Sequence, residues 1–198
     1  MKIKRIIYED ISNGSGFRVS VFISYCPGVI WSKKTKRYEH CPGCFNSEAW
    51  ADKGEDLTDG LLGKILSSLE PDYIDGLSVL GGEPMCRENQ PVVWKLVEAV
   101  REKFGSKKTI WLWSGFVSTK SVFNKNRIPY TKYKRRILKN VDVLVDGPFM
   151  RDKFDIDLKH RGSSNQRVHP HPHPLLLEKA NLPGEGGKRG TSRTAWRP

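Results

Sequence analysis

The stretch LSVLGGEP at residues 77–84 decides the fold of this chain, because a short apolar strand is expected to end there in two glycines. Glycines at the end of a strand let a ligand approach the backbone closely. Working outward, β-rich apolar segments also occur at residues 18–24, 109–113 and 141–145. We therefore expect four strands, and we expect the two tryptophans of the third strand, Trp111 and Trp113, to lie in the core.

Apolar residues recur at helical spacing between these strands. One set lies at residues 61–69 and a second at residues 92–104, and a basic helix is expected around residues 132–139. An apolar stripe with the period of a helix indicates a helix that packs on a core. Strands that alternate with helices predict an α/β fold with a mostly parallel sheet.

The expected strands are followed by residues that bring chemistry or tight turns. Cys26, Gly81–Gly82, Ser114–Gly115 and Asp146–Gly147 each come directly after one of them. In parallel sheets the reactive groups gather beyond the carboxyl ends of the strands. The sequence therefore predicts a single pocket built by four loops.

The composition excludes several classes of protein. The 198 residues contain no run of 18 apolar residues, so no membrane span is expected. The first residues lack the apolar stretch and the cleavage site of a secretory signal, which predicts a cytoplasmic protein. Disulfides are rare in that compartment, so the four cysteines indicate metal binding or redox chemistry.

The charge balance is basic, with 34 Lys and Arg against 22 Asp and Glu and a net charge of +12. Such a balance suits nucleic acid, nucleotides or an acidic protein surface. The basic residues lie in scattered clusters at 33–37, at 132–136 and near the C-terminus, without interleaved aromatic residues for stacking on bases. We expect a solvated basic exterior and no direct contact with nucleic acid.

The cysteine spacing alone leaves two metal centres open. Cys41 and Cys44 form a CxxC pair, and Cys26 lies 15 positions before Cys41. With Cys86 as a fourth ligand these residues fit a structural zinc site, and without it they fit an iron–sulfur cluster that has an open iron. The position of Cys26 directly after a core strand, beside a glycine-rich rim that carries a carboxylate, favours a catalytic layout.

At this point the chain resembles the radical S-adenosylmethionine superfamily, through residues 22–26, CPGCFN at 41–46 and GGEP at 81–84. More closely, it is similar to the activases of anaerobic ribonucleoside-triphosphate reductases. The supporting stretches occur in the family's order over residues 5–168, and they are residues 13–18, 41–46, 76–84, WLWSGF at 111–116, VDVLVDG at 141–147 and RGSSNQR at 161–167. The last of these is the most diagnostic for the subfamily.

The resemblance implies a partial (βα) barrel with a mostly parallel sheet and two cofactors. Cys26, Cys41 and Cys44 would hold a [4Fe–4S] cluster whose fourth iron binds S-adenosylmethionine. Gly81, Gly82, Glu83 and Pro84 would hold the methionine amino group of that cofactor. The remaining assignments are Ser114 for its carboxylate or ribose, Asp146 for the ribose or for structure, and Gly43 and Phe45 for the adenine. The scheme requires no acid–base side chain.

The implied reaction takes place on another protein. A reduced cluster would cleave S-adenosylmethionine, and the resulting 5′-deoxyadenosyl radical would take a Cα hydrogen from one glycine of the large subunit of the reductase. A flavodoxin-type protein is the expected electron donor. On charge alone, Lys33, Lys34, Lys36 and Arg37 are expected to face an acidic patch of the reductase, and a partial barrel leaves an open side for its glycine loop.

One departure from the family keeps an alternative open. The family usually has three residues between its first two cluster cysteines, whereas 14 residues, 27–40, lie between Cys26 and Cys41 here. A loop of that length costs only about 1 kcal/mol of extra closure entropy. Similarly enlarged loops occur in 7-carboxy-7-deazaguanine synthases, which are the second interpretation. RGSSNQR and WLWSGF favour the activase.

The segment from His169 onward differs in composition from the rest of the chain. It alternates histidine with proline and then becomes rich in glycine, lysine and arginine without a sustained period. We expect an activase domain over residues 1–168 and a disordered tail over residues 169–198. His169, His171 and His173 could bind a metal, but an unstructured extension is the simpler interpretation.

Overall fold

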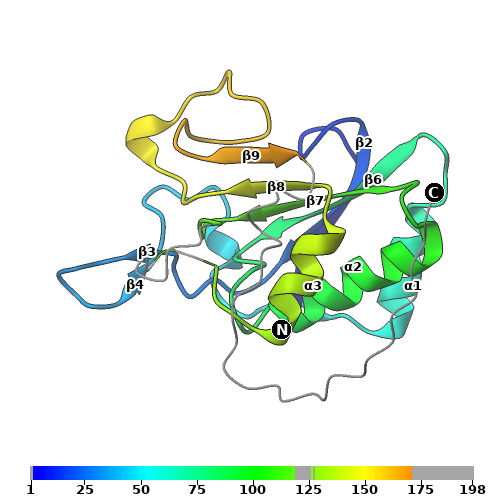
Figure 1. Ribbon diagram of the computed structural model, residues 1–198, viewed down its shortest axis with the longest axis horizontal. Helices are drawn as coiled ribbons and strands as arrows, with labels where there is room; N and C mark the ends of the chain where they lie inside the picture. Colours follow the sequence, from blue (N-terminus) through cyan, green and yellow to red (C-terminus); the bar gives the residue numbers. More distant parts are fainter. Residues whose placement is uncertain (1, 119–125, 127, 171–198) are drawn as a thin grey trace, which may run out of the picture.

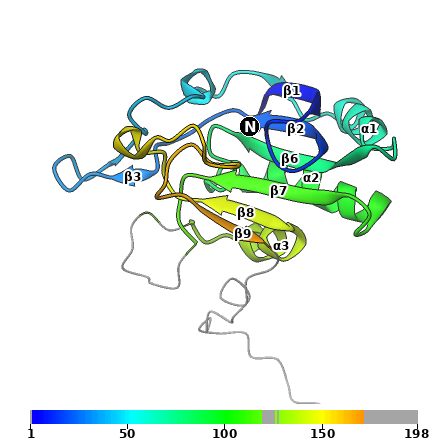
Figure 2. The same cartoon turned by 90° about the horizontal axis from the view of Figure 1, so that it is seen from above.

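A seven-stranded sheet forms the centre of the computed structural model, which describes residues 2–118, 126 and 128–170 (Figures 1 and 2). The strands lie in the order β5-β1-β2-β6-β7-β8-β9. Their bounds are β1 Lys2–Asp10, β2 Phe17–Ile23, β5 Glu55–Asp56, β6 Ile74–Gly81, β7 Thr109–Ser114, β8 Val143–Asp146 and β9 Arg167–Pro170. Two short strands, β3 Ile30–Trp31 and β4 Tyr38–Glu39, pair separately as a hairpin.

The centre of the sheet is parallel and its edges are antiparallel. β2, β6, β7 and β8 run parallel, whereas β1 and β5 on one side and β9 on the other run antiparallel to their neighbours. The α/β class and the parallel centre are thus confirmed, in a sheet that is mixed. Because the four parallel strands end at the same edge, the loops that follow them are neighbours.

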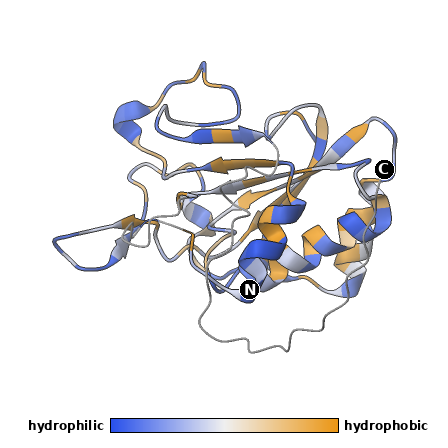
Figure 3. Cartoon of the chain, in the orientation of Figure 1, coloured by the Kyte–Doolittle hydropathy of each residue, from blue (hydrophilic) through white to orange (hydrophobic). Residues whose placement is uncertain are grey.

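Three helices cover one face of this sheet (Figure 1), namely α1 Asp59–Ser68, α2 Gln90–Phe104 and α3 Lys132–Asn140. Threonine side chains begin two of them: the hydroxyl of Thr58 accepts the N–H of Leu61 at 3.2 Å, and Thr131 caps α3 in the same way. Figure 3 shows the apolar side of the helices turned toward the strands. None of the helices in the described ranges is long and apolar enough to cross a membrane.

The main core lies between the helices and the sheet. Alternate strand residues point to opposite faces, so one set from each parallel strand meets the helices. The buried residues on this side are Val19, Val21, Ile23, Leu77, Val79, Ile110, Leu112 and Leu144 from the strands, and Ile65, Val93, Leu96, Val97 and Ile137 from the helices. The intervening residues, among them Phe22, Leu80 and Trp113, face the other side, which we call the inner face.

Arg18 closes the inner face at the amino ends of the parallel strands. Its guanidinium is fully buried and donates to the Ser78 hydroxyl at 2.7 Å and to the carbonyls of Leu77 and Thr109 at 2.8 and 2.9 Å. Burial lowers the pKa of Arg18 to about 10, so it stays charged at neutral pH. Gly14 packs against the Arg18 side chain, and a Cβ on Gly14 would come within 2.7 Å of it. This close contact and the φ of +115° both require glycine at this position.

The expected elements and the observed ones differ mainly at the edges of the sheet. The strand expected at residues 141–145 begins only at Val143, because α3 continues to Asn140 and Val141 caps it. β1, β5, β9 and the β3–β4 hairpin were not expected from the sequence. His169 and Pro170 pair with β8 as part of β9, although their composition placed them in the tail. The rest of that segment, including His171 and His173, lies outside the described residues.

Candidate functional site

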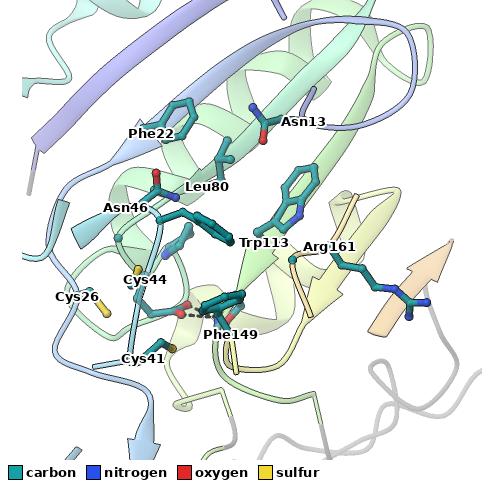
Figure 4. A pocket seen from close by; sticks show the side chains of 18 of the residues that line it. Asn13, Phe22, Cys26, Cys41, Cys44, Asn46, Leu80, Trp113, Phe149 and Arg161 are labelled. Atoms are coloured by element: carbon teal, nitrogen blue, oxygen red, sulfur yellow. Dashed lines mark hydrogen bonds between the residues drawn. The ribbon is translucent and has the colours of Figure 1, made fainter. Parts of the chain in front are cut away.

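A cavity of about 520 Å³ lies beside the carboxyl ends of the parallel strands and extends along the inner face (Figure 4). Cys26 and the GGEP loop line it together, as their positions after parallel strands predict, and Cys41 and Cys44 line it as well. The other residues that matter here are Phe22, Trp50, Leu80, Trp113, Ser114, Gly115, Phe45, Phe149, Asn13, His160 and Arg161.

Cys26 is held by backbone and side-chain contacts from two directions. Its N–H donates to the carbonyl of Trp50 at 3.0 Å. The Nε2–H of His40 donates to the carbonyl of Cys26 at 2.8 Å, and the His40 ring stacks on Trp50 with centroids 4.0 Å apart. The residue before Cys41 thus ties the start of the inserted loop to its end.

Cys41 and Cys44 lie in one tight turn. The N–H of Cys44 donates to the carbonyl of Cys41 at 3.2 Å, and Gly43 has the left-handed φ of +70° that the turn requires. Gly43 itself does not line the cavity, because a Cβ on it would face Arg151 at 3.2 Å. Phe45 does line the cavity, but 67% of its surface is exposed.

The thiols of Cys26 and Cys41 are protonated at neutral pH in the metal-free protein. Burial raises the pKa of Cys26 to about 12 and that of Cys41 to about 11, and the nearby carboxylate of Glu83 adds to both shifts. Thiolates are the species that bind metal, so metal binding here must release protons. A centre with high affinity for thiolate sulfur meets that requirement.

The three thiols of Cys26, Cys41 and Cys44 line one cavity. Among residues 2–118, 126 and 128–170, no group of three His, Cys, Asp or Glu side chains converges closely enough to hold one metal ion. In an iron–sulfur cluster the thiolates bind different irons, and the ligands surround a larger object. Cys86 is 1% exposed and does not line the cavity, so the structure does not supply the fourth ligand that the zinc interpretation requires.

The two glycines of GGEP let this loop press against the loop that carries Cys26. Gly81 has φ +118°, and a Cβ on it would lie 2.5 Å from the Ile23 carbonyl oxygen. A Cβ on Gly82 would lie 2.4 Å from the carbonyl oxygen of Tyr25. The N–H groups of Gly82 and Glu83 donate to these two carbonyls at 2.7 and 2.9 Å. Close backbone packing therefore explains both glycines, and it places Glu83 next to the cysteines.

Glu83 is a buried carboxylate whose oxygens accept hydrogen bonds from neutral groups. It is 1% exposed and accepts from the Ser114 hydroxyl at 2.7 Å and from the N–H groups of Met85 and Gly115 at 2.8 and 2.7 Å. Burial raises its pKa to about 7, and these hydrogen bonds limit the rise. No Lys or Arg of the described part of the chain forms an ion pair with it. The arrangement can accept a cationic group of a ligand.

Ser114 and Asp146, which both follow parallel strands, have different surroundings. Ser114 lines the cavity and orients Glu83. Asp146 is fully buried outside the cavity lining, where it accepts two hydrogen bonds of 2.9 Å from Arg167 and lies 3.2 Å from Nε2 of His169. These contacts favour the structural alternative for Asp146, which joins β8 to β9.

The RGSSNQR segment forms one side of the cavity through its own hydrogen bonds. The Gln166 amide accepts the N–H of Gly162 at 2.9 Å and donates to the carbonyl of Gly147 at 3.0 Å. Asn165 donates to the carbonyl of Pro148 at 2.8 Å. Gly162 leaves room for two phenylalanine rings, because a Cβ there would meet Phe45 and Phe149 at 3.1 and 3.2 Å.

Several lining residues were not singled out from the sequence. Trp113 was expected in the core, but it lines the cavity and donates its indole N–H to the His160 carbonyl at 2.9 Å, whereas Trp111 is buried. Phe22 and Leu80 are placed there by strand alternation, which could have identified them. Phe149 and His160 belong to irregular segments, and no pattern in the sequence indicates where those segments fold back.

Comparisons with known proteins identify the family and an iron–sulfur cluster domain. The family described as 4Fe-4S single cluster domain matches residues 12–169. The anaerobic ribonucleoside-triphosphate reductase-activating proteins of Escherichia coli (strain K12) and Vibrio cholerae (serotype O1) are each 32% identical over 163 residues, covering 81% of this chain and 92% of the relative. That of Enterobacteria phage T4 is 32% identical over 170 residues, covering 85% and 93%.

No solved structure gave a significant match to this chain. The family assignment therefore rests on the sequence relatives and on the cluster-domain match, both of which span most of the chain. The chain belongs to the family of anaerobic ribonucleoside-triphosphate reductase-activating proteins.

Proposed function

We propose that this protein is a radical S-adenosylmethionine activase that generates a glycyl radical on an anaerobic ribonucleoside-triphosphate reductase. The observation that carries the proposal is that Cys26, Cys41 and Cys44 line the same cavity as the buried carboxylate of Glu83. When bound, a [4Fe–4S] cluster supplies the electron that reductively cleaves S-adenosylmethionine and so starts the radical chemistry. The donor set of three thiolates fits such a cluster and leaves one iron for the cofactor.

The residues of the GGEP rim bind and orient the methionine end of the cofactor. Glu83 accepts hydrogen bonds from its ammonium group, which supplies the cation that this carboxylate lacks in the described structure. Ser114 and the N–H of Gly115 fix the orientation of the carboxylate through their 2.7 Å hydrogen bonds. A buried carboxylate that is held in place beforehand loses little entropy when it binds a ligand.

The aromatic and apolar lining protects the reaction from water. Phe22, Leu80 and Trp113 form the inner-face wall of the cavity. Phe45 and Phe149, with ring centroids 4.7 Å apart, stand at the side of the cysteine turn. Rings in this position suit contact with the adenine.

We assign the sheet to the partial (βα) barrel type of this superfamily. The assignment is supported by four parallel strands, by helices on one face only, and by an inner face that carries the cavity. The uncovered side would admit a glycine loop of the large subunit. The expected setting is a cytoplasmic one, with a flavodoxin-type donor and with residues 1–168 as the active domain.

The deazapurine synthase alternative depends on the enlarged cluster loop. Only Val29 of residues 27–40 lines the cavity, so the insertion adds almost nothing to the wall that would recognise a small substrate. The observation favours the activase.

The proposal is tested by anaerobic reconstitution with iron and sulfide, followed by electron paramagnetic resonance of the reduced protein. We expect a [4Fe–4S]⁺ signal that changes when S-adenosylmethionine is added, and a glycyl radical signal when the reductase is also present. A protein that keeps one zinc and takes up no iron would overturn the radical function. A cluster that cleaves S-adenosylmethionine but forms no radical on the reductase would overturn the choice of substrate.

A further inference from the structure

The insertion between the first two cluster cysteines is a folded arm. β3 and β4 pair through Ile30 with Glu39 and Trp31 with Tyr38, and the N–H of Ser32 closes the turn onto the Arg37 carbonyl at 2.9 Å. Figure 1 shows this hairpin projecting beyond the sheet. We call residues 30–39 the arm and residues 33–37 its tip.

The base of the arm is anchored to the cavity wall by packing. Val29 is buried, and Gly115 is a glycine because a Cβ there would lie 2.7 Å from the Val29 side chain. The Tyr38 ring packs edge-on against both Trp31 and Phe116, with centroids 5.3 and 5.9 Å apart. The arm therefore has a fixed position relative to the mouth of the cavity.

The tip carries four positive charges within five residues. Its four cationic side chains are exposed, and none of them forms an ion pair with a carboxylate of the described residues; they are Lys33, Lys34, Lys36 and Arg37. Glu39 is the only acidic residue of the arm, and its carboxylate accepts a hydrogen bond from the Thr35 hydroxyl at 2.8 Å. Holding four like charges on a rigid turn costs electrostatic energy that an opposite charge would recover.

We infer that the tip of the arm docks an acidic surface of the reductase beside the glycine that receives the radical; this inference rests on the proposed function. A macromolecule that inserts a loop into the cavity comes close to the arm, because Val29, directly before the arm, lines the cavity. An electron donor does not have to approach along the arm, since it needs only proximity to the cluster. The tip also contains no aromatic side chain on which a nucleic acid base could stack.

Complementary charge at the edge of an interface mainly accelerates association and makes it depend on salt. Exposed charges are screened over a Debye length of about 10 Å at 0.1 M salt. The contribution of the tip should therefore be large at low ionic strength and small at high ionic strength.

The experiment compares two variants of the full cluster-loaded chain that lose the same charge. The tip variant combines Lys33→Gln, Lys34→Gln, Lys36→Gln and Arg37→Gln. The control variant combines Lys132→Gln, Arg135→Gln, Arg136→Gln and Lys139→Gln, which are exposed positions on α3. For each protein we would measure the Kd for the purified reductase at 25 and 300 mM salt, and the cleavage of S-adenosylmethionine by dithionite-reduced protein without the reductase.

We expect the tip variant to bind the reductase roughly tenfold more weakly at low salt, as the loss of up to four exposed ion pairs predicts. At high salt the difference should nearly vanish, and cofactor cleavage without the reductase should be unchanged. Equal weakening in both variants, or in neither, overturns the docking site. So does a tip variant that loses only reduction by a flavodoxin, or one that loses only binding to nucleic acid.

The outcome also separates this inference from the proposed function. Wild-type protein that forms a glycyl radical, with equal affinities in both variants, sinks the docking site and leaves the activase intact. If the wild type binds the reductase, the tip variant binds it more weakly, and the wild type forms no glycyl radical, the docking site stands and the activase function is refuted. Wild-type protein that does not bind the reductase refutes both.

Discussion

The two faces of the central strands differ in what they contribute. On β7, Leu112 is fully buried against the helices, whereas the next residue, Trp113, lines the cavity on the inner face. On β6, Val79 and Leu80 divide in the same way. Strand alternation thus lets one short segment stabilise the fold and build the site, so neighbouring substitutions should have separable effects.

The largest effect is expected at the rim, where a single thiol determines whether the metal is held. Replacing Cys44, the least buried of the three proposed cluster ligands, with alanine should abolish the [4Fe–4S]⁺ signal and cofactor cleavage while leaving the fold intact. Iron analysis, paramagnetic resonance and circular dichroism would measure these three properties.

Cys86→Ala is the matched control for that change, because Cys86 is buried outside the cavity lining. It should keep its iron and lose about 1 kcal/mol of stability through the loss of buried contacts. If Cys86→Ala also lost the metal, the assignment of Cys86 to the core rather than to the metal site would be wrong.

The next largest effect should separate the two faces of β7. Leu112→Ala should lower the free energy of unfolding by about 2–5 kcal/mol, since it leaves a hole in the core under the helices. Trp113→Ala should cost less stability, because this side chain is only half-buried, but it should weaken binding of S-adenosylmethionine. Urea denaturation and equilibrium binding to the loaded protein would test the pair, and a reversed order would contradict the assignment of faces.

Glu83 should make the stability of the folded protein depend on pH. Its pKa is about 7 in the folded protein against an ordinary 4.5, so the folded state holds a proton that the unfolded state releases between these values. The stability of the metal-free protein should therefore fall as pH rises from 4.5 to 7, by at most about 3 kcal/mol.

Urea denaturation at a series of pH values would measure this slope in the wild type and in Glu83→Gln, which cannot titrate. The difference in stability between the two proteins should change across that pH range in the direction given. A constant difference would show that the carboxylate ionises in the folded protein as easily as in water.

The smallest effect is expected on the helical side, far from the metal. Thr58→Ala removes the hydroxyl that accepts the Leu61 N–H at the start of α1, and it should cost about 1 kcal/mol. Cluster content and cofactor cleavage should not change. Thermal unfolding and iron analysis of one preparation would show both, and a loss of iron would tie this face to the site.

The sequence was informative where a local pattern has one physical meaning. The apolar segments at 18–24 and 109–113 could be recognised as strands because they are rich in β-branched and aromatic residues. The positions of Cys26, Ser114 and the GGEP loop after parallel strands predicted that they line one cavity, and they do. β1 escaped because its sequence, KIKRIIYED, mixes charged and apolar residues without a regular alternation, as suits a half-buried strand. Its pairing with β2 depends on tertiary contacts that no local period encodes.

The same limit applied to individual site residues. The position of Asp146 after a strand was correct, but that position does not specify whether a carboxylate faces the cavity or Arg167. Trp113 and Trp111 could not be separated without knowing which face the helices cover. The hairpin in residues 27–40 was missed because its strands are only two residues long, too short to produce an alternation.

That hairpin also changes how the length of the insertion should be counted. Val29 N–H and the Glu39 carbonyl, joined at 3.0 Å, bring the two ends of the insertion together, and His40 then binds back to Cys26 at 2.8 Å. The cysteines are therefore connected, in effect, by a short path across the base of the hairpin, and the remaining residues form a side branch. We therefore expect that lengthening or shortening that branch at its turn leaves Cys26 and Cys41 in their present positions.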